Sequence, residues 1–295
     1  MFDGHSKVRN GAMCAVIALT TAGTSLAATA SNADAAQVPS NSQSCKPVSL
    51  WANTGDHGAR LLEFNPATGA KLRDVPLTRV YGDIAFSSDG KTLYGADWAS
   101  PSVLATIDPR TGQEISTIPI TGPAGAVGII SLTALPNGLL LAGSGTTTVW
   151  TIDPRTGASA AYADFPAGFS ASGDLMVLGD GDVISLRRSA TDPTALFRLH
   201  PDRTTTELGS LPASYGLAQS AGRTYSFTAD GRILRLNPVP RNSSTQPLGF
   251  TEVKNTGDQF FGATSTQSAG SCDDGRRPLG SALFDLIHKI FSWIF

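Results

Sequence analysis

The chain contains one short stretch in three close copies: Asn65-Pro66-Ala67-Thr68-Gly69, Asp108-Pro109-Arg110-Thr111-Gly112 and Asp153-Pro154-Arg155-Thr156-Gly157. Less complete copies follow at His200-Pro201-Asp202-Arg203-Thr204 and at Asn237-Pro238. Successive copies start 43, 45, 47 and 37 residues apart. A period in the low forties is typical of a four-stranded propeller blade. The repeat therefore predicts an all-β propeller.

Each copy of the stretch predicts the turn of a β-hairpin. An alternating strand precedes it, as in Leu104–Ile107, and a second short strand follows, as in Glu114–Ile118. The Asp or Asn side chain bonds to the nearby backbone, Pro fixes φ, and Gly supplies a positive φ. We therefore expect these Asp residues to form turns rather than to bind a ligand.

An earlier pair of strands belongs to each repeat. In the second repeat these are Asp83–Phe86 and Thr92–Ala96, joined by Ser88-Asp89-Gly90. Four strands per repeat predict propeller blades rather than the coils of a solenoid. The count is five blades, with six left open because residues 165–195 are the least regular stretch.

The first repeat lacks an innermost strand, because it begins with Leu50–Asn53, which matches a second strand. Near the end of the chain, Gly257-Asp258-Gln259-Phe260-Phe261-Gly262 echoes Gly82-Asp83-Ile84-Ala85-Phe86. We expect this C-terminal strand to complete the first blade and to close the ring. Closure removes the exposed sheet edges that invite aggregation.

The N-terminal region has the pattern of a secretory signal peptide. Lys7 and Arg9 precede an apolar run from Ala12 to Leu26, and small-residue cleavage sites follow it. The predicted organisation is a signal peptide over residues 1–35, a polar leader over 36–44 and a propeller over 45–272. This organisation predicts a secreted, extracytoplasmic protein.

Two cysteines remain after the signal peptide, Cys45 and Cys272, just outside the first and last predicted strands. In an exported protein such a pair predicts a disulfide. Free thiols or a metal pair are the alternatives.

The tail has a different character from the propeller. After a polar spacer at 273–278, residues 279–295 predict an amphipathic helix, because apolar residues recur at helical spacing. The residues of this partner face include Leu279, Leu283, Leu286, Ile290, Trp293 and Ile294. The run is short for spanning a bilayer and suits a membrane or envelope surface. Docking on the propeller itself and self-association are the alternatives.

Carboxylates are the candidate metal ligands. Asp83 and Asp258 occupy matching positions in the two echoed strands, at the expected channel mouth, and Asp174, Asp180 and Asp182 could join them. Converging carboxylates could hold Ca²⁺. The interpretation we favour is that they begin strands and turns. The sequence has no Gly-x-Ser-x-Gly elbow and no Ser, His and Asp constellation, so it supplies no catalytic residues.

The composition suits an extracellular all-β domain. Only 16% of the residues are charged, and the formal net charge is −2. Because no basic stripe is present, the sequence argues against a nucleic-acid partner.

The repeated Leu-x-x-Ile-Asp-Pro-x-Thr-Gly hairpins, with a cysteine before the first blade and Ser271-Cys272 after the last, resemble a known group. They are similar to bacterial exported β-propeller domains of unassigned function, which are grouped with YVTN-type and quinoprotein-like propellers. The resemblance covers about residues 45–272. It implies a propeller of the kind found in surface and adhesin-like proteins, and it supplies no catalytic residues.

These observations favour a secreted, envelope-associated and non-enzymatic module that presents a propeller face to a protein or glycan. The alternative is an extracellular lactonase- or lyase-like propeller enzyme with a metal at the channel mouth. A third reading is a structural envelope protein that assembles through its tail.

Overall fold

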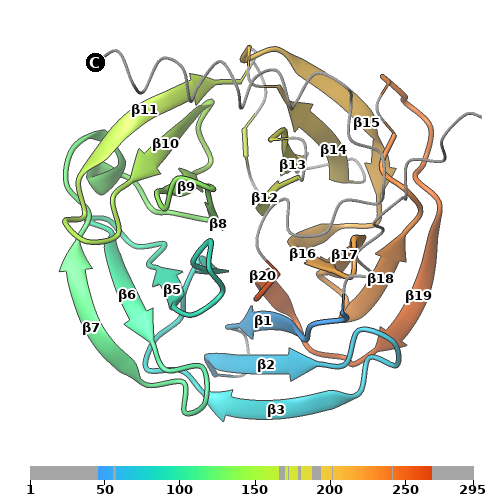
Figure 1. Ribbon diagram of the computed structural model, residues 1–295, viewed down its shortest axis with the longest axis horizontal. Helices are drawn as coiled ribbons and strands as arrows, with labels where there is room; N and C mark the ends of the chain where they lie inside the picture. Colours follow the sequence, from blue (N-terminus) through green and yellow to red (C-terminus); the bar gives the residue numbers. More distant parts are fainter. Residues whose placement is uncertain are drawn as a thin grey trace, which may run out of the picture. The chain divides into compact units, whose positions relative to one another are not determined.

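The computed structural model describes residues 46–267, apart from 56–57, 166–169, 172, 179–180, 188–193, 201 and 241. Within these residues the chain forms five antiparallel four-stranded sheets, arranged in a ring (Figure 1). We call the sheets blades 1 to 5 in chain order. The sequence predicted five blades, and this prediction is confirmed.

The first three blades have the following strands, from the inside outward. Blade 1 contains β20 (Phe260–Ser265), β1 (Leu50–Thr54), β2 (Arg60–Phe64) and β3 (Lys71–Pro76). Blade 2 contains β4 (Asp83–Phe86), β5 (Leu93–Ala96), β6 (Val103–Ile107) and β7 (Glu114–Pro119). Blade 3 contains β8 (Ser131–Ala134), β9 (Leu140–Gly143), β10 (Thr148–Ile152) and β11 (Ser159–Asp164).

Two further blades complete the ring. Blade 4 contains β12 (Leu175–Val177), β13 (Val183–Arg187), β14 (Thr194–Leu199) and β15 (Thr205–Leu211). Blade 5 contains β16 (Ser214–Ser220), β17 (Arg223–Thr228), β18 (Arg232–Leu236) and β19 (Phe250–Asn255). A short 3₁₀ helix, η1 (Pro123–Ala126), lies between blades 2 and 3 in the chain.

Burial falls from the centre of the ring outward. All four residues of β4 are buried, whereas the outer strands β3, β7 and β19 are largely exposed. The third strands β2, β6, β10 and β18 share one pattern, with buried residues at the second, third and fifth positions. Inner strands are buried on both faces because a neighbouring blade covers each face.

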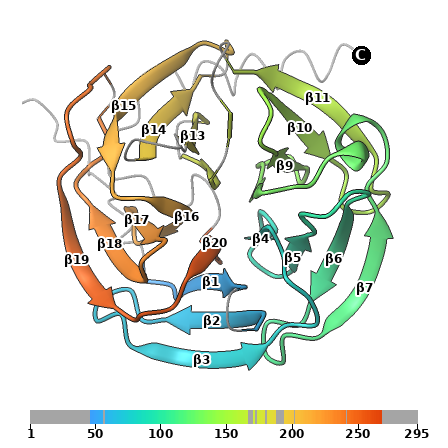
Figure 2. The same ribbon diagram turned by 180° about the vertical axis from the view of Figure 1, so that it is seen from behind.

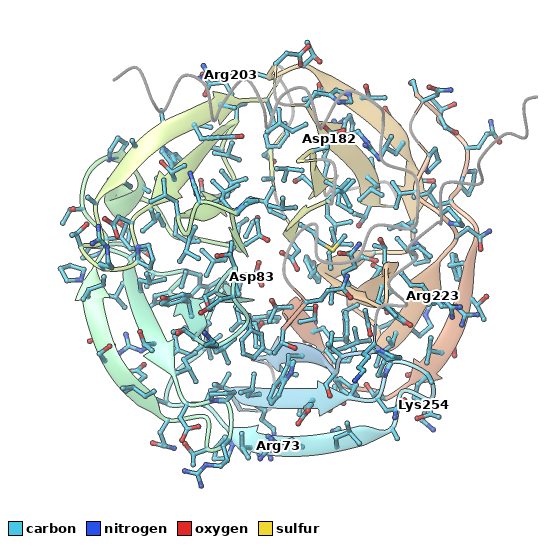
Figure 3. The ribbon with its side chains drawn as sticks, in the orientation of Figure 1. Arg73, Asp83, Asp182, Arg203, Arg223 and Lys254 are labelled. Atoms are coloured by element: carbon cyan, nitrogen blue, oxygen red, sulfur yellow. The ribbon has the colours of Figure 1, made fainter. Side chains whose placement is uncertain are left out.

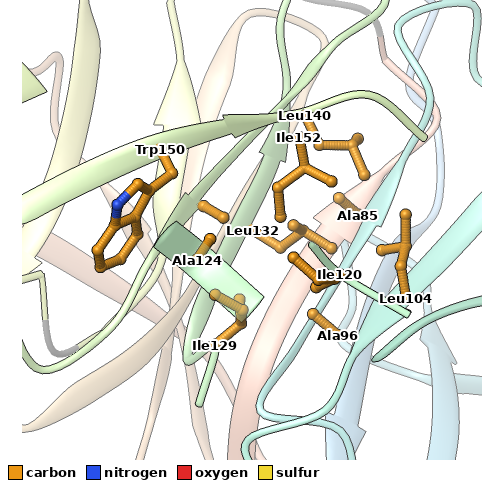
Figure 4. Close-up of a cluster of buried hydrophobic side chains, with 11 residues drawn as sticks. Ala85, Ala96, Leu104, Ile120, Ala124, Ile129, Leu132, Leu140, Trp150 and Ile152 are labelled. Carbon is orange, nitrogen blue, oxygen red and sulfur yellow. The ribbon is translucent and has the colours of Figure 1, made fainter. Parts of the chain in front are cut away.

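The hydrophobic core is divided into five clusters, one at each interface between blades. Between blades 2 and 3, Leu104 and Ala85 pack with Leu132, Leu140 and other apolar side chains (Figure 4). No blade can bury both of its faces alone, so each depends on its two neighbours.

The last described strand closes the ring. β20 pairs antiparallel with β1, with Leu50 opposite Ser265 and Ala52 opposite Ala263. The view from behind shows the same placement of β20 beside β1 (Figure 2). The predicted closure by a C-terminal innermost strand is confirmed.

The repeated stretch forms the turn between the third and fourth strands of a blade. In blade 2 the Asp108 carboxylate accepts a hydrogen bond from the Arg110 N–H at 2.8 Å, and the Gly112 N–H donates to the Asp108 carbonyl at 2.8 Å. Gly112 has a φ of 74°. The Asp residue therefore forms the turn, as the sequence predicted.

Several predictions concern residues outside the described range. The signal peptide, Cys45, Cys272, Asp180 and the tail helix over 279–295 all lie there. Within the described residues the structure has no α-helix, and no helix there is long and apolar enough to span a membrane.

Candidate functional site

Two carboxyl groups, those of Asp83 and Asp174, lie in the centre of the ring. Asp83 begins the innermost strand of blade 2, and Asp174 immediately precedes the innermost strand of blade 4. Both residues are 0% exposed. Figure 3 shows Asp83 beside the centre of the ring.

The two carboxyls accept hydrogen bonds from the free edges of all five innermost strands. Asp83 accepts from the N–H groups of Ile84 and Leu132, each at 2.7 Å. Asp174 accepts from three further N–H groups, those of Leu175 at 2.6 Å, Leu217 at 2.6 Å and Ala263 at 3.4 Å.

The geometry has a simple cause. The inner edge of each innermost strand has no partner strand, so its N–H groups would be buried and unpaired. Two aspartates supply the missing acceptors for five blades, and a glycine makes room for them. A Cβ built on Gly262 would lie 1.8 Å from the Asp83 Oδ1 atom.

The environment of the pair favours its protonated form. Burial raises the pKa of Asp83 well above its usual range, and the neighbouring Asp174 carboxyl raises it further. Burial also raises the pKa of Asp174, although a hydrogen bond from Asp83 and bonds from backbone N–H groups oppose that effect. The two groups thus behave as a coupled pair that retains a proton between them.

A small cavity of about 40 Å³ adjoins the pair along the channel. It is lined by residues of all five innermost strands, and by Ser87, Ser88 and Gln267. Water molecules or a single ion fit a cavity of this size, whereas organic ligands usually need several hundred Å³.

The other predicted ligands lie apart from the pair and have partners of their own. Asp258 forms an ion pair with Lys71, with 3.2 Å between the Oδ2 and Nζ atoms. The predicted match between Asp258 and Asp83 is wrong, because the register of blade 1 puts Gly262 of β20 beside Asp83.

Asp182 belongs to a separate polar cluster in blade 4. Its Oδ2 atom lies 2.6 Å from Nη1 of Arg198 and 3.2 Å from Nδ1 of His200. The other ring nitrogen of His200 lies 3.0 Å from the Thr206 hydroxyl. Arg198 is only 4% exposed, and a buried positive charge is costly unless a negative charge pairs with it. Asp182 supplies that charge, so a structural ion pair explains the cluster.

Within the described residues, no group of three or more His, Cys, Asp and Glu side chains is placed to hold a metal ion. Of the described Ca²⁺ candidates, the structure brings together Asp83 and Asp174, whereas Asp182 and Asp258 each pair with a basic side chain. The sequence signal for the observed pair is Gly173-Asp174-Leu175, which repeats Gly82-Asp83-Ile84.

A second candidate site is an exposed aromatic side chain in the loop between β5 and β6. Trp98 is 58% exposed, and the centroid of its ring lies 6.3 Å from that of Phe261. The adjacent Asp97 accepts hydrogen bonds at its carbonyl from the Ser102 hydroxyl at 2.6 Å and from the Ile129 N–H at 3.1 Å. The loop is thus fixed from both sides.

Asp97, the residue before Trp98, belongs to a network of charged groups. Arg79 forms a two-point ion pair with Glu114, with contacts of 2.5 and 3.1 Å, and its Nη1 atom lies 3.5 Å from Asp97. Tyr81 donates a hydrogen bond to Glu114 at 2.7 Å, and burial raises the pKa of its hydroxyl.

Comparison with known proteins gives no family for this chain. No family model matches it, and no curated protein matches its sequence. Among solved structures, it resembles a candidate 6-phosphogluconolactonase of Bacteroides fragilis, with 15% identity and a TM-score of 0.45 over 77% of this chain and 99% of that chain.

Two other similar structures are U3-55K and a Bacteroides caccae protein of unknown function. U3-55K is 14% identical with a TM-score of 0.43, over 70% of this chain and 64% of that one. The B. caccae protein is 15% identical with a TM-score of 0.40, over 65% and 70% of the two chains. This chain spans less than two thirds of the U3-55K structure. At these similarities none of the three defines an activity here.

Proposed function

We propose that this protein is an extracytoplasmic, non-enzymatic binding module that presents one face of the propeller to a protein or glycan. The observation that carries the proposal is Trp98, a large and exposed aromatic residue on a fixed loop. Tryptophan dominates many binding interfaces because one ring buries a large apolar area. A preformed loop loses little conformational freedom on binding.

The state of the central carboxyls supports a role without catalysis. Asp83 and Asp174 are fully buried and already accept backbone N–H groups. A metal-dependent lactonase or lyase would need such groups free to coordinate an ion. The small channel cavity also leaves little room for an organic substrate.

The leader pattern at the N-terminus supports export, and the apolar tail pattern supports association with a membrane or envelope surface. Both are part of the same proposal, since a binding module needs access to ligands outside the cytoplasm. A disulfide between Cys45 and Cys272 would suit that compartment.

The test is binding of the labelled protein to a glycan array and to purified envelope proteins. We expect Trp98→Ala to weaken whatever binding the native protein shows by at least about tenfold, a loss usual for a central aromatic residue. Ile115→Ala is the matched control, because Ile115 is 68% exposed on the outer strand β7. The control variant should bind like the native protein.

Equal binding by the Trp98→Ala variant and the native protein would mean that the interface lies on another face of the propeller. Binding to no array component or envelope protein, or turnover of lactone or polysaccharide substrates by the native protein, would contradict the proposal itself.

A further inference from the structure

The central channel carries a ring of backbone carbonyl groups in addition to the carboxyl pair. One residue in each innermost strand directs its N–H to that pair: Ile84, Leu132, Leu175, Leu217 and Ala263. In an antiparallel strand the N–H and C=O groups of one residue point to the same side. The five carbonyls of these residues therefore also face the channel.

These carbonyls are available to a ligand. None of the five accepts a hydrogen bond from another group in the described part of the protein outside the regular strand pairing. Four of the five residues, all except Ile84, line the 40 Å³ cavity. Oxygen acceptors from separate blades thus surround one small space.

A second unpartnered polar group lies on the wall of the cavity. The side-chain amide of Gln267, which follows β20, has both its nitrogen and its oxygen buried without a hydrogen-bond partner among the described residues. A buried amide is rarely left unpaired, so the side chain points to an occupant that the described residues do not provide.

The charge of the carboxyl pair lacks compensation from basic side chains. The hydrogen-bond and ion-pair partners of Asp83 and Asp174 in the described chain include no lysine or arginine. A buried negative charge is costly unless a positive charge lies close to it. A cation among the carbonyls would supply that charge.

We propose that the channel binds one alkali cation, Na⁺ or K⁺, through the carbonyl oxygens of the five innermost strands. Rings of backbone carbonyls replace the hydration shell of such ions in other proteins. Calcium is less suitable, because it takes six to eight oxygen ligands and favours carboxylates. Here the carboxylates are already bonded to N–H groups, and the carbonyls are neutral.

The first experiment is thermal unfolding of the full chain in NaCl or KCl, with choline chloride at the same ionic strength as the reference. An ion that binds only the folded state should raise Tm by about 2–4 °C once its concentration exceeds its Kd about fivefold. A crystal grown in RbCl should then show an anomalous peak on the channel axis.

Two variants separate this site from general effects of salt. The double variant Asp83→Asn/Asp174→Asn removes the one negative charge that the pair carries while it retains a proton, and should abolish the difference between alkali and choline salts. Asp258→Asn removes a carboxylate that pairs with Lys71 and should keep the difference.

Equal Tm values in NaCl, KCl and choline chloride would overturn the proposal, and a channel that holds only water in RbCl would overturn a K⁺ site. If this double variant does not fold, the anomalous map of the native protein decides. The outcome is independent of binding at Trp98, so the two proposals fail separately.

Discussion

Asp83 and Asp174 replace the strand partners that the centre of the ring cannot supply. Each takes N–H groups from more than one blade, so each contributes to the joining of blades that are distant in sequence. Burial makes their charged forms unfavourable, and the raised pKa values have a consequence for stability.

The stability of the protein should depend on pH through this pair. The unfolded Asp pKa is about 3.9, and both folded values lie above it. The stabilisation is therefore complete below about pH 4 and is lost as pH rises toward the folded values. For each proton retained only by the folded state, the free energy of unfolding falls by about 1.4 kcal/mol per pH unit.

Urea unfolding between pH 4 and 8 checks this expectation. Asp83→Asn should be less stable than the native protein near pH 4, because one N–H loses its acceptor, but its stability should fall less steeply as pH rises. Glu252→Gln, an exposed position on β19, is the control and should follow the native curve. Parallel curves for Asp83→Asn and the native protein would show that no proton is retained.

The sequence predicted part of this centre. Asp83 was recognised as an innermost-strand residue, and the repeat of Gly-Asp-Leu at Asp174 carries the same signal. Asp258 was matched incorrectly because the closing strand begins at Phe260, later than the similar residues suggested. The sharing of five N–H groups by two carboxyls depends on the width of the ring, which no local pattern encodes.

At the scale of single elements, the repeated turn has two roles. It reverses the chain within one blade, and its glycine also contacts the outer strand of the preceding blade. A Cβ on Gly112 would lie 2.1 Å from the Pro76 carbonyl oxygen, and a Cβ on Gly157 would lie 2.1 Å from that of Pro119. The contact between blades explains why glycine recurs here, beyond the needs of the turn.

Replacement of these glycines should be more harmful than replacement of an ordinary turn glycine. Gly138→Ala, in the turn between β8 and β9, should cost about 1–2 kcal/mol because its φ is 86°. Nothing lies within 4 Å of a Cβ at that position. Gly112→Ala has the same backbone penalty and a clash with a neighbouring strand, so we expect a further loss of about 1–3 kcal/mol.

Denaturant unfolding of the two variants measures the difference. A loss at Gly112 no greater than that at Gly138 would mean that the blades adjust freely to each other at their outer edge. It would also mean that the turn alone accounts for the repeat.

Elements with strong local patterns were predicted most closely, and blade 4 was predicted least closely. Residues 165–195 were the least regular stretch of the sequence, and β12 (Leu175–Val177) and β13 (Val183–Arg187) lie there. The innermost strand of this blade is short. Asp182, just before the second strand, pairs with Arg198. Tertiary contacts of this kind override local alternation.

At the scale of the whole molecule, the ring depends on the junction where its two ends meet. Three aromatic rings pack there, from β2 and β20 of blade 1 and from β17 of blade 5. The Phe260 ring lies edge-on to Phe64 and to Phe227, with centroids 5.8 and 5.1 Å apart. All three side chains are fully buried.

Phe260→Ala should weaken this junction and thereby the whole ring. Loss of a buried phenylalanine costs about 3–5 kcal/mol, because the cavity adds to the lost burial. Phe250→Ala is the matched control, since Phe250 is 39% exposed on β19 and should cost well under about 1 kcal/mol. Urea unfolding gives both values, and hydrogen exchange locates the weakened region. If the ring opens at this junction, the amides of β1, β16 and β20 should lose protection before those of blade 3. Uniform loss of protection across all five blades would instead indicate that the ring unfolds as a single unit.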